Sequence, residues 1–362
     1  MIQMLVCVGP IPEPITGQSL AFETYVRNSK FKPVYFDTST DFGKSLIAKS
    51  LSRLRLFFSF FIFIATNNAT VMYITTSRSN FGFISDSVFM LLFKCICKGK
   101  IVNHLHGADF VSFRESSKLK RLIDYVYRCV DKSIVLTDSM VEQYSNYKNM
   151  EIEIVENFSQ INISSIELNE KCKSILKGNE IKILYMSNIM YSKGITHLVS
   201  AIEELNSSGF NVKLIVCGDY ASDDFLSKIK IKNQFEILMS KFNFIEYRGV
   251  IQGAQKKKVF FDSDIFCLPT FYKTEAQPLS IFEAMGCGCQ VVTTKHNYIP
   301  SYINDKEAYL AEPRDVFSLF KEIKKAIEDR DSEMIRKNYE KILTVNSIQN
   351  HVERVDRLIE EF

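Results

Sequence analysis

The sequence lacks the features that mark several broad classes of protein. It has no low-complexity tract, no repeat at a fixed period and no long linker rich in Pro, Gly or Ser, which disfavours long disordered segments. Its longest apolar run, Leu56 to Ala65, is about half of the ~20 residues that a membrane-spanning helix needs. With 362 residues, 46% hydrophobic and 24% charged, the composition is that of a globular protein of two domains.

The cysteines and the first residues add two further absences. Nine cysteines include the pairs Cys95/Cys97 and Cys287/Cys289, but neither pair is matched by a second pair at zinc-site spacing. The odd count, with several cysteines inside apolar runs, is typical of reduced thiols. No basic stretch or cleavage site of a signal peptide stands at the start of the sequence. We therefore expect a cytoplasmic protein.

Short apolar segments alternate with helical patterns through both halves of the chain. This alternation predicts parallel, doubly wound sheets. The first helix is expected to be capped by Ser19 and to end near Asn28. Strands are expected at residues 4–8, 34–36, 71–75, 100–104, 133–136 and 151–155, then at 181–186, 212–217, 244–247, 265–268 and 290–293, with further helices near 42–65, 83–98 and 116–130 and from about 315 to the end.

A polar stretch at residues 160–180 interrupts the alternation and suggests a domain boundary. We expect an N-terminal Rossmann-like domain at 1–165 and a second at 166–345. The last helix, 346–362, is expected to pack back toward the first domain. Because ligands of such sheets bind at the carboxyl ends of the strands, the ligand is expected between the two halves.

The segment after the expected strand 265–268 is the most informative one. Pro278 fits the first position of a helix, where its missing N–H costs nothing, and the N–H groups of Leu279 and Ser280 can then bind an anion. Glu283 borders the apolar stripe of this helix and needs a hydrogen-bond donor. Glu275 lies in the loop before it and is expected to face the same crevice. For an isolated pair of glutamates, a surface loop leading into a capped helix is the simpler interpretation.

Two other strand ends carry polar residues. Lys193 and Gly194 follow the strand 181–186 and open a helix, an arrangement that can set an ammonium beside a diphosphate, although a solvated lysine is the common alternative. At the strand ending near His104, alternation sends His104 and His106 to one side, and Gly107 permits a close backbone approach. A metal would need a third ligand, which is not evident at short spacing, and an ordinary core histidine is the other alternative.

The run Glu-Ala-Gln-Pro-Leu-Ser-Ile-Phe-Glu-Ala-Met-Gly-Cys-Gly, beginning at Glu275, closely resembles the signature of retaining glycosyltransferases of family 4. The resemblance implies the GT-B fold, two Rossmann-like domains whose parallel sheets face each other across a cleft. It places Glu275 beside the donor sugar and Glu283 on the ribose hydroxyls of the nucleotide. The loop that contacts sugar and phosphate then comprises Gln277, Pro278, Leu279 and Ser280.

The same resemblance assigns roles elsewhere. Lys193 matches a lysine that grips the leaving diphosphate, but the neighbouring arginine of the family is replaced by Asn188, which leaves room for another phosphate partner such as an arginine of the N-terminal domain. His106 matches a histidine near the anomeric carbon, and Asp109 is a candidate on the acceptor side. Gly17 belongs to a loop resembling the one that closes over the donor. The nucleotide base pocket is expected around Gly218 and Gly249.

These features predict a retaining glycosyltransferase. It would move a sugar from a nucleotide-sugar donor, a UDP- or GDP-sugar, to a hydroxyl of a glycan or lipid-linked acceptor in bacterial surface polysaccharide assembly. No Asp-x-Asp element stands where a metal would be needed, so no metal or other cofactor is expected. The alternatives are a sugar-nucleotide epimerase or hydrolase of similar fold, and a non-catalytic scaffold at a membrane surface. A dehydrogenase is disfavoured because no Gly-x-Gly-x-x-Gly follows the first strand.

Charge is unevenly distributed along the chain. Residues 1–150 contain 18 Lys and Arg against 11 Asp and Glu, a net charge of +7, whereas the remainder contains 27 against 31, a net charge of −4. Lys49, Arg53 and Arg55 precede the Phe-rich run Leu56–Ala65, a pattern typical of an interfacial helix, although a buried helix fits equally well. We expect no nucleic-acid partner, and peripheral contact with the anionic inner face of the cytoplasmic membrane.

Overall fold

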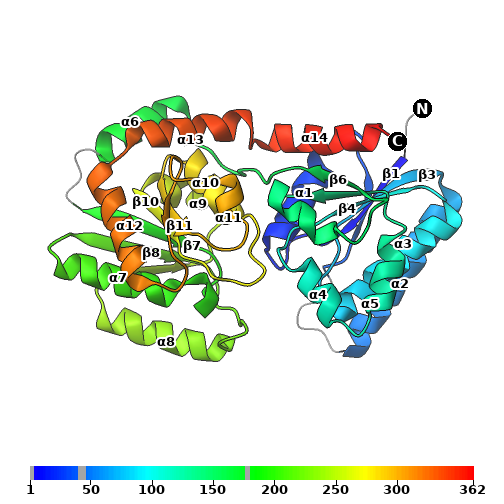
Figure 1. Cartoon of the computed structure of the whole chain (residues 1–362), viewed down its shortest axis with the longest axis horizontal. Coiled ribbons are helices and arrows are strands. Elements are labelled where there is room, and N and C mark those ends of the chain that lie inside the picture. The colour runs from blue at the N-terminus through cyan, green and yellow to red at the C-terminus, as the bar shows by residue number, and fades with distance from the viewer. Residues whose placement is uncertain (1–3, 40–45, 176–179) are drawn as a thin grey trace. The chain divides into compact units, whose positions relative to one another are not determined.

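The computed structural model describes residues 4–39, 46–175 and 180–362, which divide into two units. Unit 1 contains the residues up to Asn157 together with Ile348–Phe362, and unit 2 contains Phe158–Ser347. Each unit is built on its own six-stranded parallel sheet with helices beside it (Figure 1).

The sheet of unit 1 has the strand order β2-β1-β3-β4-β5-β6, and every pairing in it is parallel. Its order reverses at the junction of β1 and β3, the point at which doubly wound sheets open a crevice at the carboxyl ends of the strands. The strands are β1 (Met4–Gly9), β2 (Val34–Asp37), β3 (Ala69–Ile74), β4 (Lys100–His104), β5 (Lys132–Val135) and β6 (Glu151–Ile154).

Helices pack on this sheet through apolar side chains. The side chains of Phe22 and Tyr25 from the first helix, and of Val355 and Ile359 from the last, join the strand residues in one buried cluster. The helical segments of unit 1 are α1 (Gly17–Asn28), α2 (Leu46–Thr66), α3 (Asn80–Ile96), α4 (Phe110–Ser116), α5 (Lys120–Tyr127), the 3₁₀ turn η1 (Asp138–Tyr144) and α14 (Ile348–Glu360). In the described parts of the chain, no helix is both long enough and apolar enough to cross a membrane.

Helix α14 is tied to unit 1 by a buried carboxylate. Asp356 accepts hydrogen bonds from the Tyr25 hydroxyl at 3.0 Å, from Ser29 Oγ at 2.7 Å and from the Lys30 N–H at 3.0 Å. A buried carboxylate is tolerated only when donors compensate for lost water. These bonds therefore fix the register of the C-terminal helix on α1.

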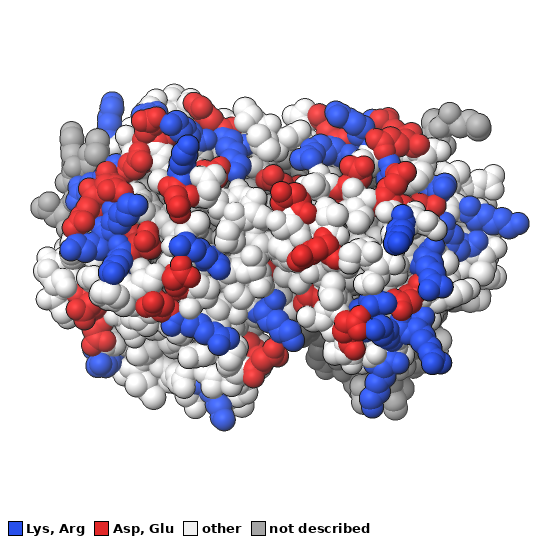
Figure 2. Space-filling model, in the orientation of Figure 1, with Lys and Arg blue, Asp and Glu red and all other residues white. Residues whose placement is uncertain are grey.

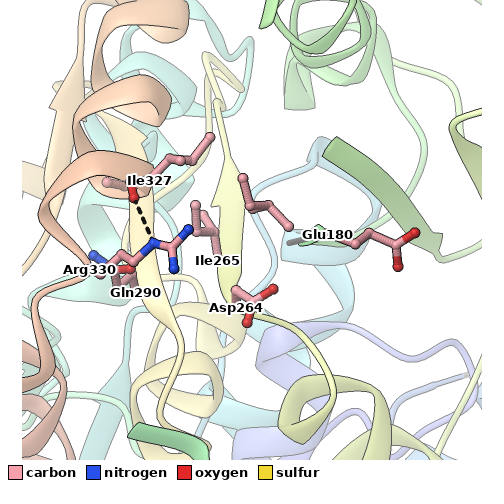
Figure 3. A pocket seen from close by; sticks show the side chains of 8 residues that line it. Glu180, Asp264, Ile265, Gln290, Ile327 and Arg330 are labelled. Atoms are coloured by element: carbon pink, nitrogen blue, oxygen red, sulfur yellow. Dashed lines mark hydrogen bonds between the residues drawn. The ribbon is translucent and has the colours of Figure 1, made fainter. Parts of the chain in front are cut away.

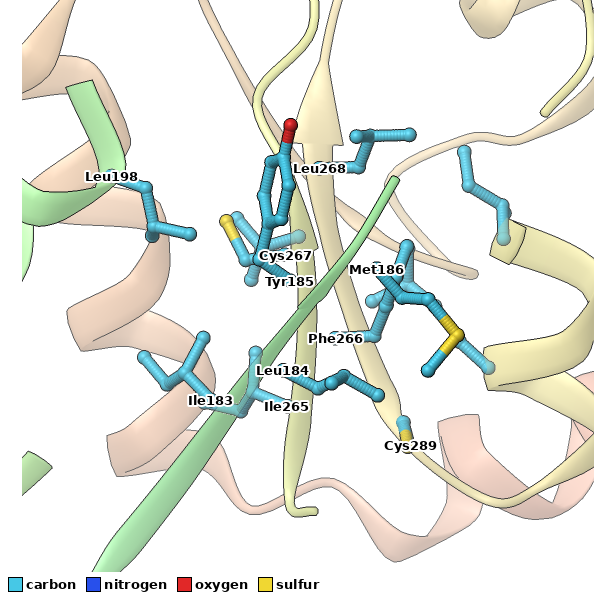
Figure 4. Close-up of a cluster of buried hydrophobic side chains, with 14 of the residues drawn as sticks. Ile183, Leu184, Tyr185, Met186, Leu198, Ile265, Phe266, Cys267, Leu268 and Cys289 are labelled. Carbon is cyan, nitrogen blue, oxygen red and sulfur yellow. The ribbon is translucent and has the colours of Figure 1, made fainter. Parts of the chain in front are cut away.

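The sheet of unit 2 has the order β12-β11-β10-β7-β8-β9. When the strands are renumbered from the start of the unit, this is the Rossmann order, with the reversal between β7 and β10. Figure 4 shows apolar side chains of these two strands, among them Leu184 and Phe266, packed together in the core. The strands are β7 (Ile181–Met186), β8 (Val212–Cys217), β9 (Ile245–Gly249), β10 (Ile265–Leu268), β11 (Gln290–Thr294) and β12 (Tyr309–Ala311).

The helical segments of unit 2 complete the alternation. They are α6 (Ser165–Ile175), η2 (Tyr191–Lys193), α7 (Ile195–Ser207), α8 (Lys228–Lys241), α9 (Gly253–Phe261), α10 (Leu279–Gly286), α11 (Ile299–Tyr302), α12 (Val316–Asp329) and α13 (Ser332–Thr344).

Some elements differ from the local predictions. The cap of α1 is Thr16, whose hydroxyl accepts from the Ser19 N–H at 3.0 Å, while Ser19 Oγ accepts from the Thr16 N–H at 2.9 Å; Ser19 is the third residue of a capping box. The helix expected at 116–130 is the shorter α5, and the helix α4 that precedes it was not expected. Strand β12 was not expected, because it has only three residues. The expected helix start near residue 42 lies outside the described residues.

Candidate functional site

The predicted site residues of unit 2 lie at or after the carboxyl ends of four strands, β7, β8, β9 and β10. These ends share one edge of the sheet because all pairings between its strands are parallel. Because β7 and β10 pair in parallel at the reversal of strand order, the loops after these two strands flank the expected crevice. Lys193 lies in one of them and Glu275 in the other.

Glu275 and Lys193 are in direct contact. The carboxylate of Glu275 pairs with Nζ of Lys193 and accepts a hydrogen bond from Thr270 Oγ1 at 3.0 Å. Glu275 is only 8% exposed. Although Glu275 lies in a loop, its side chain is therefore buried, since the loop folds inward onto Lys193.

Two residues that the sequence did not single out hold this loop. The side-chain amide of Asn297, which adopts a left-handed backbone conformation (φ 46°), donates to the carbonyl oxygens of Lys273 and Glu275, each at 3.0 Å. Nε2 of His296 lies 2.9 Å from the carbonyl oxygen of Tyr272. The only signal for them is their place just after strand β11, at the same edge of the sheet.

Lys193 ends the 3₁₀ turn η2, and Gly194 caps the helix α7 that follows. Gly194 has φ 79°, and a Cβ there would collide with the carbonyl of Pro269. The glycine therefore lets the turn pack against the chain leaving β10. Nζ of Lys193 also lies 5.1 Å from the centre of the Tyr272 ring.

The sequence analysis expected Pro278 to be the first helical residue of α10. In the structure, Pro278 is the N-cap of that helix. Its ψ of 124° is extended, so the helix begins at Leu279. The N–H groups of Leu279 and Ser280 still stand at the open N-terminus of the helix, where an anion is favoured. Gln277, just before the cap, is buried.

Glu283 is buried on α10, and it has the hydrogen-bond donor that the sequence analysis required. Its Oε1 lies 2.5 Å from Nζ of Lys256, on helix α9. Lys256 was not identified from the sequence. The run Lys256-Lys257-Lys258 is its only signal, and such runs are more often solvated.

The predicted glycines of the base pocket play different parts. Gly218 has φ 146°, its N–H donates to the carbonyl of Gly249 at 2.8 Å, and a Cβ would collide with the carbonyl of Ser187. Gly218 is thus required by the packing of the chain after β7. Gly249 has φ 67° and open space where a Cβ would be, so it leaves room for a ligand. Asn188 is exposed.

In unit 1, the predicted histidines lie against each other. The ring centres of His104 and His106 are 4.0 Å apart, and the Tyr73 hydroxyl lies 2.7 Å from Nδ1 of His104. Both ring nitrogens of His106 are buried and have no hydrogen-bond partner among the described residues. Burial, with His351 and Arg78 nearby, lowers the pKa of His106 to about 3. Burial likewise lowers the pKa of His104 well below its usual value, so both rings are neutral at pH 7.

Asp109, the candidate on the acceptor side, is held in an ion pair. Its Oδ1 lies 2.5 Å from Nε of Arg78, which follows strand β3. A Cβ at Gly107 would collide with the same guanidinium. Gly107 therefore permits the close approach of Arg78. Gly17, the first residue of α1, has open space at its Cβ position.

Two pockets of unit 2 lie at the other edge of its sheet. The first is lined by residues at the amino ends of β7, β10 and β11, including Glu180, Asp264 and Gln290 (Figure 3). The second shares Glu180 and Asp264 and adds Lys171 and Lys182. Neither contains a predicted site residue. In the described ranges, no group of three or more His, Cys, Asp or Glu side chains is placed to hold a metal ion.

Comparison with known proteins agrees with this arrangement. The family model of glycosyl transferases group 1 matches residues 167–360, more than half of the chain. The chain therefore belongs to the group 1 glycosyltransferases.

Two curated relatives illustrate the range of the family. Over 147 residues the chain is 29% identical to a subunit of the phosphatidylinositol N-acetylglucosaminyltransferase of Arabidopsis thaliana, covering 41% of this chain and 31% of that protein. Over 173 residues it is 24% identical to the capsular polysaccharide biosynthesis glycosyltransferase CapM of Staphylococcus aureus, covering 48% and 43%. The chain thus spans less than half of the length of either relative.

Solved structures share the whole fold. Anabaena HepE, solved in complex with UDP, has a TM-score of 0.71 at 14% identity and covers 99% of this chain and 100% of its own. Sucrose-phosphate synthase from Thermosynechococcus elongatus has a TM-score of 0.71 at 12% identity, with 99% of each chain covered. With its two parallel six-stranded sheets, the chain has the GT-B fold.

Proposed function

We propose that the chain is a retaining glycosyltransferase that moves a sugar from a UDP- or GDP-sugar to a hydroxyl of a glycan or lipid-linked acceptor, in surface polysaccharide assembly. The observation that carries the proposal is the contact between Lys193 and Glu275 at the reversal of strand order in unit 2. It places a cation and a carboxylate side by side, the two charges that a departing diphosphate and an electron-poor sugar require.

The chemistry follows from these charges. Lys193 and the N–H groups of Leu279 and Ser280 stabilise the diphosphate as it leaves. Glu275 orients the sugar and stabilises positive charge at the anomeric carbon. An oxygen of the diphosphate accepts the proton of the acceptor hydroxyl, which attacks from the face that the diphosphate left, so the configuration is retained.

Nucleotide binding is assigned to the other ion pair. Glu283 accepts hydrogen bonds from the ribose hydroxyls, and Lys256 pairs with its buried carboxylate. Gly249 leaves space for the base, and Gln277 and Pro278 shape the sugar side of the loop. His106 remains a candidate contact to the sugar, because a neutral imidazole can donate or accept a hydrogen bond without repelling a cationic centre.

Donor turnover tests the proposal directly. The purified chain should hydrolyse or transfer from one sugar nucleotide in a panel of UDP- and GDP-sugars, and that donor should raise the melting temperature by mass action. Proton NMR of the product should show the anomeric configuration of the donor. Inversion would contradict the retaining mechanism, and the absence of binding to every sugar nucleotide would contradict the assignment as a whole.

Glu275→Gln tests the central contact. The amide keeps the shape and the bond to Thr270 but removes the charge, so turnover should be nearly abolished, while donor affinity should change much less. Lys295→Ala, on an exposed pair with Glu312, is the matched control. Near-normal turnover of Glu275→Gln would contradict the role of Glu275.

We assign the acceptor to the class of lipid-linked sugars at a membrane surface. A lipid-linked sugar is presented at a bilayer surface, and the excess of basic charge in residues 1–150 suits the anionic inner face of the cytoplasmic membrane. On this proposal the chain works as a peripheral membrane protein.

A further inference from the structure

The outer faces of α2 and α3 carry apolar side chains where a protein surface in water is normally charged. On α2, exposed residues recur at the spacing of one helix face, and Leu54 and Phe58 are 62% and 65% exposed. On α3, Phe81 is 78% exposed. We define the α2–α3 apolar face as Leu51, Leu54, Phe58, Phe61 and Ile62 of α2 with Phe81, Ile84 and Ile96 of α3.

The inner side of α2 is apolar as well. Phe60 and Ile64 are buried, and the Phe60 ring packs edge-on against Phe36 of β2 and Phe89 of α3, at 5.1 and 5.0 Å between ring centres. A helix with apolar residues on all sides is normally covered on all sides. The inner residues already account for the packing on unit 1, so the outer face needs a different environment.

The exposed charges on these two helices are all positive. Residues 46–96 contain a single acidic residue, Asp86, and it is buried. Arg55 is exposed beside the apolar residues. Arg53, which the sequence analysis also placed at the membrane, instead points inward and donates to the carbonyl of Thr38 at 3.3 Å. The α2–α3 apolar face thus offers no exposed carboxylate to an approaching anionic surface.

Other surfaces of the chain differ. Where unit 2 is drawn in Figure 2, Lys and Arg are interspersed with Asp and Glu. On α8 of unit 2, Ile229 and Ile237 are 72% and 65% exposed, but they stand among charged residues that include the pair Lys232–Glu236. Isolated apolar residues of that kind are ordinary, whereas a contiguous apolar face marks an interaction surface.

We propose that the α2–α3 apolar face inserts into the outer part of a bilayer that contains anionic lipids. The helices would lie in the plane of the interface, with aromatic and aliphatic side chains among the acyl chains and Arg55 at the head groups. The proposal deepens the acceptor class given under Proposed function, but the surface itself is tested without donor or acceptor. Because most of the contact is apolar, binding should survive salt that screens charges beyond about 8 Å.

The absence of tryptophan from the chain provides a direct probe. Phe58→Trp and Ile229→Trp each introduce one fluorophore at similarly exposed positions of the two units. With vesicles of phosphatidylglycerol and phosphatidylethanolamine, Phe58→Trp should shift its emission to the blue and be quenched by lipids brominated on the acyl chains. Ile229→Trp should show neither change. Equal behaviour of the two variants would overturn the proposal.

A pair of charge insertions tests the energetics. Leu54→Glu with Phe58→Glu should reduce co-sedimentation of the full chain with these vesicles at least tenfold, whereas Ile229→Glu with Ile237→Glu should leave it unchanged. Donor affinity by calorimetry should be unaffected in both, so a failure here is distinguishable from a failure of the glycosyltransferase assignment.

Sedimentation velocity tests the alternative, in which a second copy of the chain covers the α2–α3 apolar face. A wild-type dimer that becomes monomeric in Leu54→Glu with Phe58→Glu, together with no vesicle binding, would overturn the proposal and assign the face to a second copy of the chain. Vesicle binding by a monomer, lost in the same variant, is the expected result.

Discussion

The candidate glutamates of unit 2 and the histidines of unit 1 are in opposite electrostatic states. In unit 2 these residues are charged and paired, Lys193 with Glu275 and Lys256 with Glu283. In unit 1, His104 and His106 are neutral because burial lowers their pKa values. Charged pairs can exchange partners with a diphosphate, whereas a neutral imidazole cannot attract one. Under the proposed function, the difference favours recognition of the diphosphate by unit 2 and an uncharged sugar contact by the histidines of unit 1.

The largest effect should come from removing a charge from unit 2. Lys193→Ala should slow turnover by about 100-fold or more, as loss of one charge stabiliser does in a water-poor site. It also leaves Glu275 buried without its cation. Steady-state kinetics measures the loss, and circular dichroism checks the fold. A loss of less than a few-fold would mean that the diphosphate is held elsewhere.

Acid should destabilise unit 1 more than unit 2. The pKa values of His106 and His351 are lowered to about 3 and about 4, below that of an unfolded histidine, so stability is lost as pH falls from about 6.5 toward these values. The loss at pH 5 is about 2 kcal/mol for each histidine. Asp86, whose pKa burial raises to about 6, acts in the opposite direction below pH 6 and offsets part of it.

Hydrogen exchange at pH 7.5 and pH 5.0, each corrected for intrinsic rates, measures this effect separately for peptides of the two units. His351→Asn should reduce the pH sensitivity of unit 1. Equal loss of protection in both units would remove the contrast between them.

A smaller effect is expected at the second ion pair. Glu283→Ala should weaken nucleotide binding by about tenfold, equivalent to ~1.4 kcal/mol. Lys256→Met should weaken it less, because the carboxylate that is assigned to the ribose remains. Calorimetric titration with the nucleoside diphosphate measures both. A greater loss in Lys256→Met than in Glu283→Ala would transfer the ligand contact from the glutamate to the lysine.

The smallest effect should follow from adding a charge. Asn188 is exposed at the end of β7, so Asn188→Arg should be tolerated and should strengthen donor binding by no more than a few-fold, as exposed ion pairs do. Donor affinity by calorimetry is again the readout. Loss of activity in a folded Asn188→Arg variant would place the phosphates away from this strand end.

Local pattern predicted much of the fold. Strands β4, β7, β8 and β10 begin and end at the predicted residues, because a buried parallel strand is a short apolar run between polar ends. The run around Glu275 also identified the family. Helix α4 was missed, since a break between two short helices without Gly or Pro leaves little trace in the sequence.

Side-chain partners were the part that the sequence could not supply. Lys256 lies 27 residues from Glu283, and Lys193 lies 82 residues from Glu275. Arg78 and Asp109, which also pair with each other, are 31 residues apart in the sequence. Such contacts depend on which strand ends become neighbours in the sheet. Apolar periodicity on α2 likewise indicated a helix, but only packing decides which of its two apolar faces is covered.

The return of α14 to unit 1 has a consequence for biosynthesis. Unit 2 is one continuous stretch, Phe158–Ser347, inserted into unit 1, whose last segment, Ile348–Phe362, follows it. A ribosome therefore synthesises all of unit 2 before it adds α14, the helix whose Val355 and Ile359 side chains are buried against the first sheet. Until then Tyr25 and Ser29 lack the carboxylate of Asp356. Unit 1, though begun first, therefore cannot be completed until all of unit 2 has been synthesised.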